Sequence, residues 1–465
     1  MSGNTTLSRS FFLDYLLKIT GYRDANEVKN ILKAILPLLI VELFESILSV
    51  TDTYFVSGLG SQAVAAVGFS GYILWVFNMT VFVFFIGVMV LLSQAYGAKN
   101  YELCSRIVGE NLPAAGLFGL TISMIVLLVL NPIITYLGGN LSDETKNLAI
   151  NYTTIRLYGL TIMALTITLD ASIRAAGFNK YLLFSYTTSV ILNIILDPIL
   201  IYGYLGLPSM GVKGAALATV LSQTVGLFLL FVYIKKLPFR VKACYPGRIV
   251  VKTLRVGFPG MIERMVFSLG NLAYANVISR CGDIAMASHT IGLRIESFVF
   301  TPLFAFSTVS TSMVGQSVGK GDINEAYHKG FLIAKLSVML MFILGGILLV
   351  LSPIAPKVFT DNVDVARLAT IYLFLAGISE PFLGLAMTLS SSIRGAGNTL
   401  VPMIINITLL LTIRVFLAYI LIENAVFQPL VIGAWIGMFL DVFARGIVFL
   451  FIYKRFFHKL AKKLV

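Results

Sequence analysis

Acidic side chains in two apolar segments are the groups in this sequence that can do chemistry. Glu45 and Asp52 are seven residues apart, which places them within about 20° of each other on a helix. In a later segment Asn193 precedes Asp197 by four residues, and Pro198 leaves a backbone carbonyl there without its helical donor. A carboxylate in apolar surroundings must take up a proton or hold a cation, because burial disfavours its bare charge. The spacing therefore predicts a site that exchanges protons or binds cations.

Charged residues are rare in the rest of this 465-residue sequence. Only 12% of the residues are charged and 58% are hydrophobic, whereas soluble domains carry about 25% charged residues. A soluble enzyme is therefore excluded, and since one membrane-spanning helix needs about 20 residues, the chain has room for about twelve. We expect spans at residues 32–57, 64–93, 107–137, 148–171, 181–204, 211–234, 254–278, 286–314, 328–351, 366–390, 401–422 and 431–453.

The net charge of +13 is distributed as the positive-inside rule requires. Basic residues gather in the segment 235–255 and in the tail after residue 453, and both face the cytoplasm if both termini do. We therefore expect a multi-pass plasma-membrane protein with cytoplasmic termini and no binding to nucleic acid. The first thirty residues show no pattern of a cleavable signal sequence.

The two halves of the sequence resemble each other. Shifted by 222 residues, Pro37 coincides with Pro259, and shifted by 220, Ser-Ile-Arg-Ala-Ala-Gly at 172–177 meets Ser-Ile-Arg-Gly-Ala-Gly at 392–397. We infer an all-α membrane protein with two pseudo-symmetric six-helix lobes around a central cleft, which is typical of transporters. The expected parts are an N-terminal cytoplasmic segment (1–31), an N-lobe (32–236), a basic cytoplasmic linker (237–253), a C-lobe (254–453) and a basic cytoplasmic tail (454–465).

Side chains suited to metal binding or covalent catalysis are scattered. The three histidines and three cysteines lie far apart, and residues 315–321 have the wrong spacing for a phosphate-binding loop. We therefore expect no enzyme activity, no cofactor and no ATP site. The driving force is then an ion gradient, with H⁺ or Na⁺ as the coupling ion.

Charges inside the expected spans are unevenly balanced. In the C-lobe, acids and arginines match in number, so we interpret them as a buried structural network. Its members are Glu263, Arg264, Arg294, Glu296, Glu380, Arg414, Asp441 and Arg445. In the N-lobe a single deep arginine, Arg156, faces the five acids Glu42, Glu45, Asp52, Asp170 and Asp197. This imbalance predicts ion exchange in the N-lobe, although for Glu42 and Glu45 the lining of a water pocket is the open alternative.

Several motifs give the sequence a family resemblance. Residues 50–60 (Val-Thr-Asp-Thr-Tyr-Phe-Val-Ser-Gly-Leu-Gly) and 193–201 (Asn-Ile-Ile-Leu-Asp-Pro-Ile-Leu-Ile) are similar to the helix 1 and helix 5 signatures of the multidrug and toxic compound extrusion (MATE) family. Residues 211–219 resemble the start of its helix 6, and the segments 93–98 and 315–319 resemble its loops after helices 2 and 8. The resemblance extends over nearly the whole chain.

The resemblance implies efflux of cationic or amphipathic drugs in exchange for H⁺ or Na⁺, by alternating access of two lobes. The acids on helices 1 and 5 resemble the DinF-like branch, which places ion coupling, including a candidate Na⁺ site, at Asp52, Asn193 and Asp197. The residues that the family's pattern adds to this cavity are Glu45, Asp170 and Thr219. Pro37 takes the position of the proline at which helix 1 bends.

Two other functions stay open. A flippase for a lipid-linked saccharide or lipid shares the lobe architecture of the MOP superfamily, but a pyrophosphate head group needs a cationic cavity and the N-lobe is acidic. An integral-membrane enzyme needs a metal cluster or an activated nucleophile, and neither is evident. We expect a monomer in contact with membrane lipid, with organic cations or amphipathic small molecules as its other partners.

Overall fold

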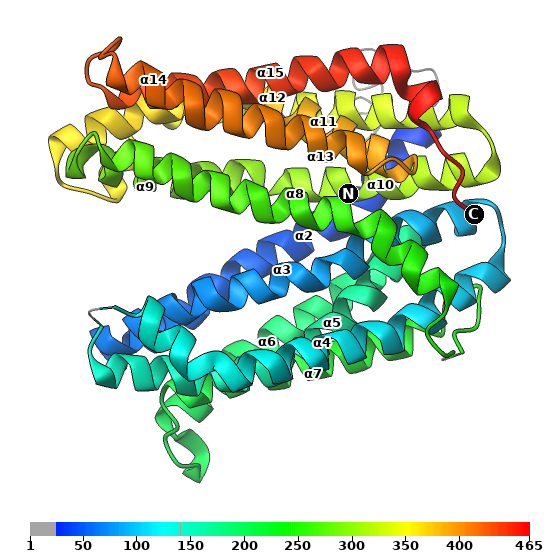
Figure 1. The fold of residues 1–465 in the computed structure, drawn as a ribbon, viewed down its shortest axis with the longest axis horizontal. Coiled ribbons are helices and arrows are strands. Elements are labelled where there is room, and N and C mark those ends of the chain that lie inside the picture. The colour runs from blue at the N-terminus through cyan, green and yellow to red at the C-terminus, as the bar shows by residue number, and fades with distance from the viewer. Residues whose placement is uncertain (1–24, 140, 243) are drawn as a thin grey trace, which may run out of the picture. The chain divides into compact units, whose positions relative to one another are not determined.

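The computed structural model describes residues 25–139, 141–242 and 244–465, which form helices joined by short turns, with no β-strand among them (Figure 1). The chain divides into two compact units. We call Pro37–Met261 the N-unit, and residues 25–36 together with Ile262–Leu464 the C-unit. Each unit is described by itself below.

Long helices form the N-unit. It contains most of α2 (Ala25–Ser57), then α3 (Ser61–Gly97), α4 (Tyr101–Leu137), α5 (Asp143–Ala176), α6 (Lys180–Tyr202), α7 (Val212–Ile234) and the start of α8 (Arg248–Ser279). Helix α5 begins at Ser142, whose hydroxyl accepts the N–H of Thr145 at 3.2 Å, and ends at Gly177 with φ +82°. Because α5 packs against α3, α4 and α7, its inner face is buried and holds polar side chains away from lipid.

The C-unit is organised around one central helix. Its further elements are α9 (Asp283–Phe300), α10 (Pro302–Lys320), α11 (Ile323–Leu351), α12 (Val363–Gly395), α13 (Leu400–Leu409), the π-helical segment η3 (Leu410–Leu417), α14 (Ala418–Glu423) and α15 (Val431–Leu460). Helix α12 packs against α9, α10, α11 and α15. The large rings of Tyr372 and Trp435 are fully buried in this core.

The boundary between the units falls inside two helices. It lies between Leu36 and Pro37 in α2 and between Met261 and Ile262 in α8, two residues beyond Pro259. A proline inside a helix removes one backbone hydrogen bond and weakens the helix at that point. Both helices are therefore weakest at the boundary.

The segment before α8 packs on α4 within the N-unit. The N–H of Cys244 donates to the carbonyl of Gly109 at 3.0 Å. The N–H groups of Gly247 and Ile249 donate to Glu110 Oε2 at 3.1 and 3.3 Å, so this carboxylate caps the start of α8. Division of the chain into lobes at residues 237–253 stays a prediction.

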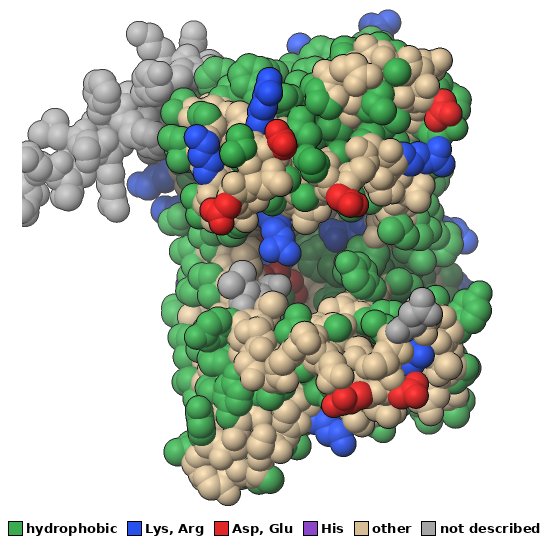
Figure 2. Space-filling model, turned by 90° about the vertical axis from the view of Figure 1, so that its left-hand side faces the viewer, with side chains coloured by type: hydrophobic (Ala, Val, Ile, Leu, Met, Phe, Trp, Pro, Cys, Tyr) green, Lys and Arg blue, Asp and Glu red, His purple; other side chains and the backbone are tan. Residues whose placement is uncertain are grey.

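Most of the described helices suit a membrane. Nine are long and apolar enough to cross it, or ten spans if α9 and α10, which meet at a 43° bend, count as one. The expected first and seventh spans, α2 and α8, have 33 and 32 residues but lie outside this set, so twelve spans stay an expectation. Large apolar side chains such as Leu128, Phe228 and Phe342 are 84%, 65% and 71% exposed. Figure 2 looks onto one end of the helices, where Lys, Arg, Asp and Glu side chains lie among other polar and hydrophobic ones.

Candidate functional site

Two aspartates from different helices form the candidate site in the N-unit. Asp52 is on α2 and partly exposed, while Asn193 and Asp197 are on α6 and fully buried, at 0% and 1% exposure. The carboxyl groups of Asp52 and Asp197 interact electrostatically. Neither oxygen of Asp197 and neither polar atom of the Asn193 side chain has a hydrogen-bond partner among the described residues. Such groups need a proton, an ion or a ligand, because a buried polar group without a partner is costly.

Arg156 and Tyr152 on α5 complete the surroundings of these acids. Arg156 acts electrostatically on Asp52, and Tyr152 interacts with Arg156 and with both aspartates. Nε and Nη1 of Arg156 are buried and form no hydrogen bond within the described part of the chain. Two carboxylates and one guanidinium leave one negative charge when both acids are ionised. The group can therefore accept one monovalent cation and become neutral.

Two further residues of the predicted cavity, Glu45 and Thr219, make their contacts away from the two aspartates. Glu45 is exposed on α2, and it interacts electrostatically with Glu42, Asp170 and Arg174. Thr219 is buried on α7, where its hydroxyl donates to the carbonyl of Ala215 in its own helix at 2.9 Å. Neither contact joins these residues to the two aspartates.

Asp170 belongs to an ion pair, and the prediction of a single deep arginine in the N-lobe is wrong. Arg174 is also buried, and its Nε lies 2.6 Å from Asp170 Oδ1 while its Nη1 lies 3.7 Å from Glu42 Oε1. The hydroxyl of Tyr186 donates to Asp170 Oδ2 at 3.2 Å. The sequence placed Arg174 beyond a span ending at residue 171, but α5 continues to Ala176. Asp170 is therefore neutralised.

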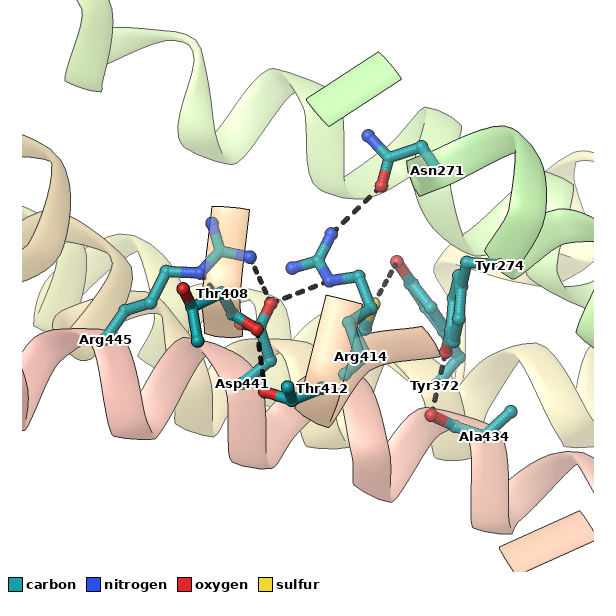
Figure 3. Close-up of polar contacts among 10 residues, drawn as sticks. Asn271, Tyr274, Tyr372, Thr408, Thr412, Arg414, Ala434, Asp441 and Arg445 are labelled. Atoms are coloured by element: carbon teal, nitrogen blue, oxygen red, sulfur yellow. Dashed lines mark hydrogen bonds and ion pairs between the residues drawn. The ribbon is translucent and has the colours of Figure 1, made fainter. Parts of the chain in front are cut away.

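In the C-unit, Asp441 on α15 is held by two arginines (Figure 3). Arg414 Nε and Arg445 Nε donate to its Oδ2 and Oδ1, each at 2.8 Å, and Arg445 Nη2 also contacts Oδ2. Arg414 Nη1 reaches Asn271 Oδ1 at 3.2 Å, and both guanidinium groups stand over the ring of Phe267, at 5.8 and 5.7 Å. Arg414 lies in the π-helical segment η3, whose wider turn is unusual in a helix. Two guanidinium groups therefore pair with the Asp441 carboxylate.

Two further predicted members of the C-lobe network interact electrostatically with this group, Glu263 with Arg445 and Glu296 with Arg414. Glu263 on α8 pairs with Arg394, Oε1 to Nη2 at 2.5 Å, and accepts the amide of Asn406 at 2.7 Å. Arg294 is exposed on α9, and Arg264 is half-buried on α8. Six of the eight predicted charges thus interact electrostatically with at least one other member: Glu263, Glu296, Glu380, Arg414, Asp441 and Arg445.

Glu296 on α9 and Glu380 on α12 form a buried acidic pair. The hydroxyl of Tyr372 donates to Glu296, and the two carboxylates interact electrostatically. Both oxygens of Glu380 are buried without a hydrogen-bond partner among the described residues. The ring of His289 stands edge-on to Tyr372, with centroids 5.3 Å apart. Glu296 also interacts electrostatically with Arg414 of the Asp441 group, and the acid count alone does not reveal this pair.

Comparisons with known proteins agree over almost the whole chain. The probable multidrug resistance protein NorM of Thermotoga maritima is 30% identical over 445 residues, 94% of each chain. The probable multidrug resistance protein YoeA of Bacillus subtilis is 26% identical over 91% of this chain and 93% of its own. A solved structure, described as the outward-facing conformation of a multidrug resistance MATE family transporter of the MOP superfamily, has a TM-score of 0.85 at 23% identity and covers 93% and 96% of the two chains. This likeness confirms the expected all-helical membrane fold.

The MatE family model matches residues 37–199 and 259–420. Its two matched segments begin at Pro37 and Pro259, which have the 222-residue separation of the internal repeat. The matched residues include both aspartates of the N-unit site and Glu380 of the C-unit. The chain therefore belongs to the MatE family, a family of multi-pass membrane transporters and not of enzymes.

Proposed function

We propose that this transporter exports cationic or amphipathic drugs in exchange for H⁺ or Na⁺ by alternating access. The names of the relatives, multidrug resistance proteins, support the substrate class. The carrying observation is the pair Asp52 and Asp197, with Asp197 buried and no described hydrogen-bond donor on its carboxylate.

Exchange follows from the charge of this site. With Arg156 beside them, the two ionised aspartates have room for one positive charge, from a proton, a sodium ion or a cationic drug. Once one cation is bound, the site is neutral. Binding of a second cation in these apolar surroundings is then unfavourable, because its desolvation costs a large free energy. Ion and drug therefore exclude each other, and their competition links export of one to entry of the other.

Asn193 suits a group whose charge changes during the cycle. Its amide can donate to an ionised Asp197 through nitrogen and accept from a protonated one through oxygen. The described residues contain no group of three or more His, Cys, Asp or Glu side chains that could hold a metal ion. A bound Na⁺ would therefore rely on Asp52, Asp197 and the oxygen of Asn193.

The finer assignments belong to the same proposal. Coupling acids on α2 and α6 support membership of the DinF-like branch, and the position of Pro37 inside α2 supports bending of that helix at this residue. The basic segments before α8 and after α15 favour cytoplasmic termini in a plasma membrane. We expect the transporter to work as a monomer.

A second exchange site in the C-unit is favoured by one observation. Glu380 is fully buried, its oxygens have no described hydrogen-bond partner, and Glu296 lies within electrostatic range. These properties match those of Asp197. We propose that this pair takes up a proton during the transport cycle.

Purified protein in liposomes tests the proposal. A cationic dye is loaded inside, and its movement is measured under a pH gradient and, separately, under a Na⁺ gradient. We expect export under at least one gradient without nucleotide. Unchanged transport after both gradients are collapsed would contradict the proposal, and movement of a lipid-linked saccharide in place of the dye would favour a flippase.

A further inference from the structure

Two arginines in equivalent positions hold the helices that contain the boundary prolines. We propose that Arg174 and Arg394 are positioning residues that fasten α2 and α8 immediately after Pro37 and Pro259, and so confine bending of each helix to its proline. The inference rests on the proposed function, in which α2 bends at Pro37 during alternating access.

In the N-unit, three helices meet at Arg174. The guanidinium comes from α5, Glu42 from α2 and Tyr186 from α6, with Asp170 of α5 between the guanidinium and the phenol. The side chains of Arg174 and Asp170 are each only 6% exposed. Glu42 lies five residues after Pro37, about one and a half turns along α2. The ion pair therefore fixes the first part of α2 that belongs to the N-unit.

In the C-unit, the same three-helix arrangement surrounds Arg394. The guanidinium comes from α12, Glu263 from α8 and Asn406 from α13, at contact distances of 2.5 and 2.7 Å. Glu263 lies four residues after Pro259 and one residue inside the C-unit boundary. This contact fixes the first part of α8 that belongs to the C-unit.

The internal repeat relates the two contacts. Arg174 and Arg394 are 220 residues apart, within the repeated Ser-Ile-Arg stretch, and Tyr186 and Asn406 are also 220 residues apart. The acids occupy neighbouring positions of the repeat, not the same one, yet each reaches its arginine. Both halves thus use a partly buried ion pair at this place, although an apolar contact of similar size costs less to desolvate. Directionality explains the choice, since an ion pair fixes the register and orientation of two helices more strictly than apolar packing does.

The contact between Glu42 and Arg174 and the ion site at Asp52 share one helix, α2. Asp52 follows Glu42 by ten residues, about 15 Å along the helix axis. If α2 could bend at any residue, the response to a change of charge at Asp52 would be a local distortion of the helix near that residue. With Glu42 held by Arg174, the part of α2 from Glu42 to Asp52 stays with the N-unit, and bending is left to Pro37, where the helix already lacks a hydrogen bond.

Spin-label distances within each unit test the inference. After replacement of the three cysteines, labels are placed on exposed residues of the N-unit (Tyr54 on α2, Tyr158 on α5) and, in a second protein, of the C-unit (Leu272 on α8, Phe374 on α12). We expect Arg174→Gln to broaden the N-unit distribution and leave the C-unit distribution unchanged. Arg394→Gln should do the opposite, which makes each variant the matched control of the other.

A second pair of variants keeps the test independent of folding. Glu42→Gln removes the charge on α2 but keeps the pair between Arg174 and Asp170, so it should broaden the N-unit distribution even if Arg174→Gln fails to fold. Arg174→Lys should restore part of the narrow distribution. Dye export should fall about tenfold in Glu42→Gln, as expected for one lost charge-assisted contact.

The outcomes separate the two proposals. A narrow, wild-type N-unit distribution in folded Glu42→Gln overturns the positioning role, whatever the export rate. If either arginine variant broadens the distance distributions of both units, the positioning role is also overturned, since that result indicates general destabilisation. If the distributions change as expected but wild-type protein moves no dye under any gradient, the contact stands and the proposed function fails.

Discussion

Asp441 in the C-unit and Asp197 in the N-unit are equally buried aspartates with opposite surroundings. Asp441 accepts hydrogen bonds from Arg414 and Arg445, and Asp197 accepts none from the described residues. A carboxylate between two guanidinium groups stays ionised, whereas one without a donor is open to a proton or a cation. Both aspartates are thus buried. The number of hydrogen-bond partners distinguishes the structural aspartate, Asp441, from the exchangeable one, Asp197.

Neutralising the exchangeable acid should have the largest effect. Asp197→Asn removes a charge that forms no ion pair, so the fold should persist while gradient-driven export falls by about 100-fold or more, as for a group essential to the transport step. Asp52→Asn should do the same, and the double variant should add little if the two acids act as one unit. Transport of a cationic dye in liposomes, measured beside the melting temperature, checks the prediction.

Asp441→Asn is the matched control for these variants. It makes the same chemical change at an equally buried aspartate, but it leaves Arg414 and Arg445 without their anion. Its melting temperature should therefore fall well below those of Asp52→Asn and Asp197→Asn. Wild-type coupled export by Asp52→Asn would refute the exchange role of the N-unit site.

Breaking the paired charge should reduce stability more than it reduces transport by folded protein. Arg445→Ala leaves Asp441 with one partner, and removing one member of a buried ion pair costs about 3–5 kcal/mol. Because Arg414 shares the same carboxylate, replacing Asp441 and Arg445 together still leaves one buried cation. Only the triple variant, with Asp441→Leu, Arg414→Met and Arg445→Met, should approach wild-type thermal stability.

Thermal unfolding in detergent measures this series. We expect the order of melting temperatures to be wild type, triple variant, double variant and single variant, from high to low. A triple variant as stable as the wild type but inactive in dye export would assign the Asp441 group to the transport mechanism.

Local spacing is what the sequence predicts well, and contacts between distant segments are what it predicts poorly. Asn193 and Asp197 are four residues apart, and helix geometry alone places both side chains on the same face of α6. In contrast, the pairing of Glu263 with Arg394 joins residues 131 positions apart, and no spacing rule points to it. Hydropathy places the ends of two helices too early, so the buried ion pairs of Arg174 and of its repeat partner Arg394 are not predicted. The bend at Thr301 is marked in the sequence by Pro302, the first residue of α10. The π-helical turn at Arg414 depends on packing and leaves no clear pattern.

The buried acid pair of the C-unit should show an intermediate effect. Glu380→Gln removes an unpartnered charge, so the melting temperature should stay the same or rise, and export should fall about tenfold if the pair forms a second exchange site. Tyr372→Phe is the control, because it deletes the hydrogen bond to Glu296 and leaves both acids in place. Wild-type export by Glu380→Gln would restrict ion exchange to the N-unit.

Thr219 should show the smallest effect, and it separates what the structure supports from what family resemblance alone suggests. The resemblance assigns Thr219 to the ion-coupling cavity, but its hydroxyl donates to the carbonyl of Ala215 in its own helix. A hydroxyl satisfied in this way contributes about 1 kcal/mol or less, and valine has the same shape. Thr219→Val should therefore change dye export by less than about threefold. Asn193→Leu, which removes a buried amide with no described partner beside Asp197, is the comparison and should reduce export more strongly. If Thr219→Val instead abolished gradient-driven export at an unchanged melting temperature, the hydroxyl would have to turn toward the aspartates during the cycle, and the ion site would extend to α7.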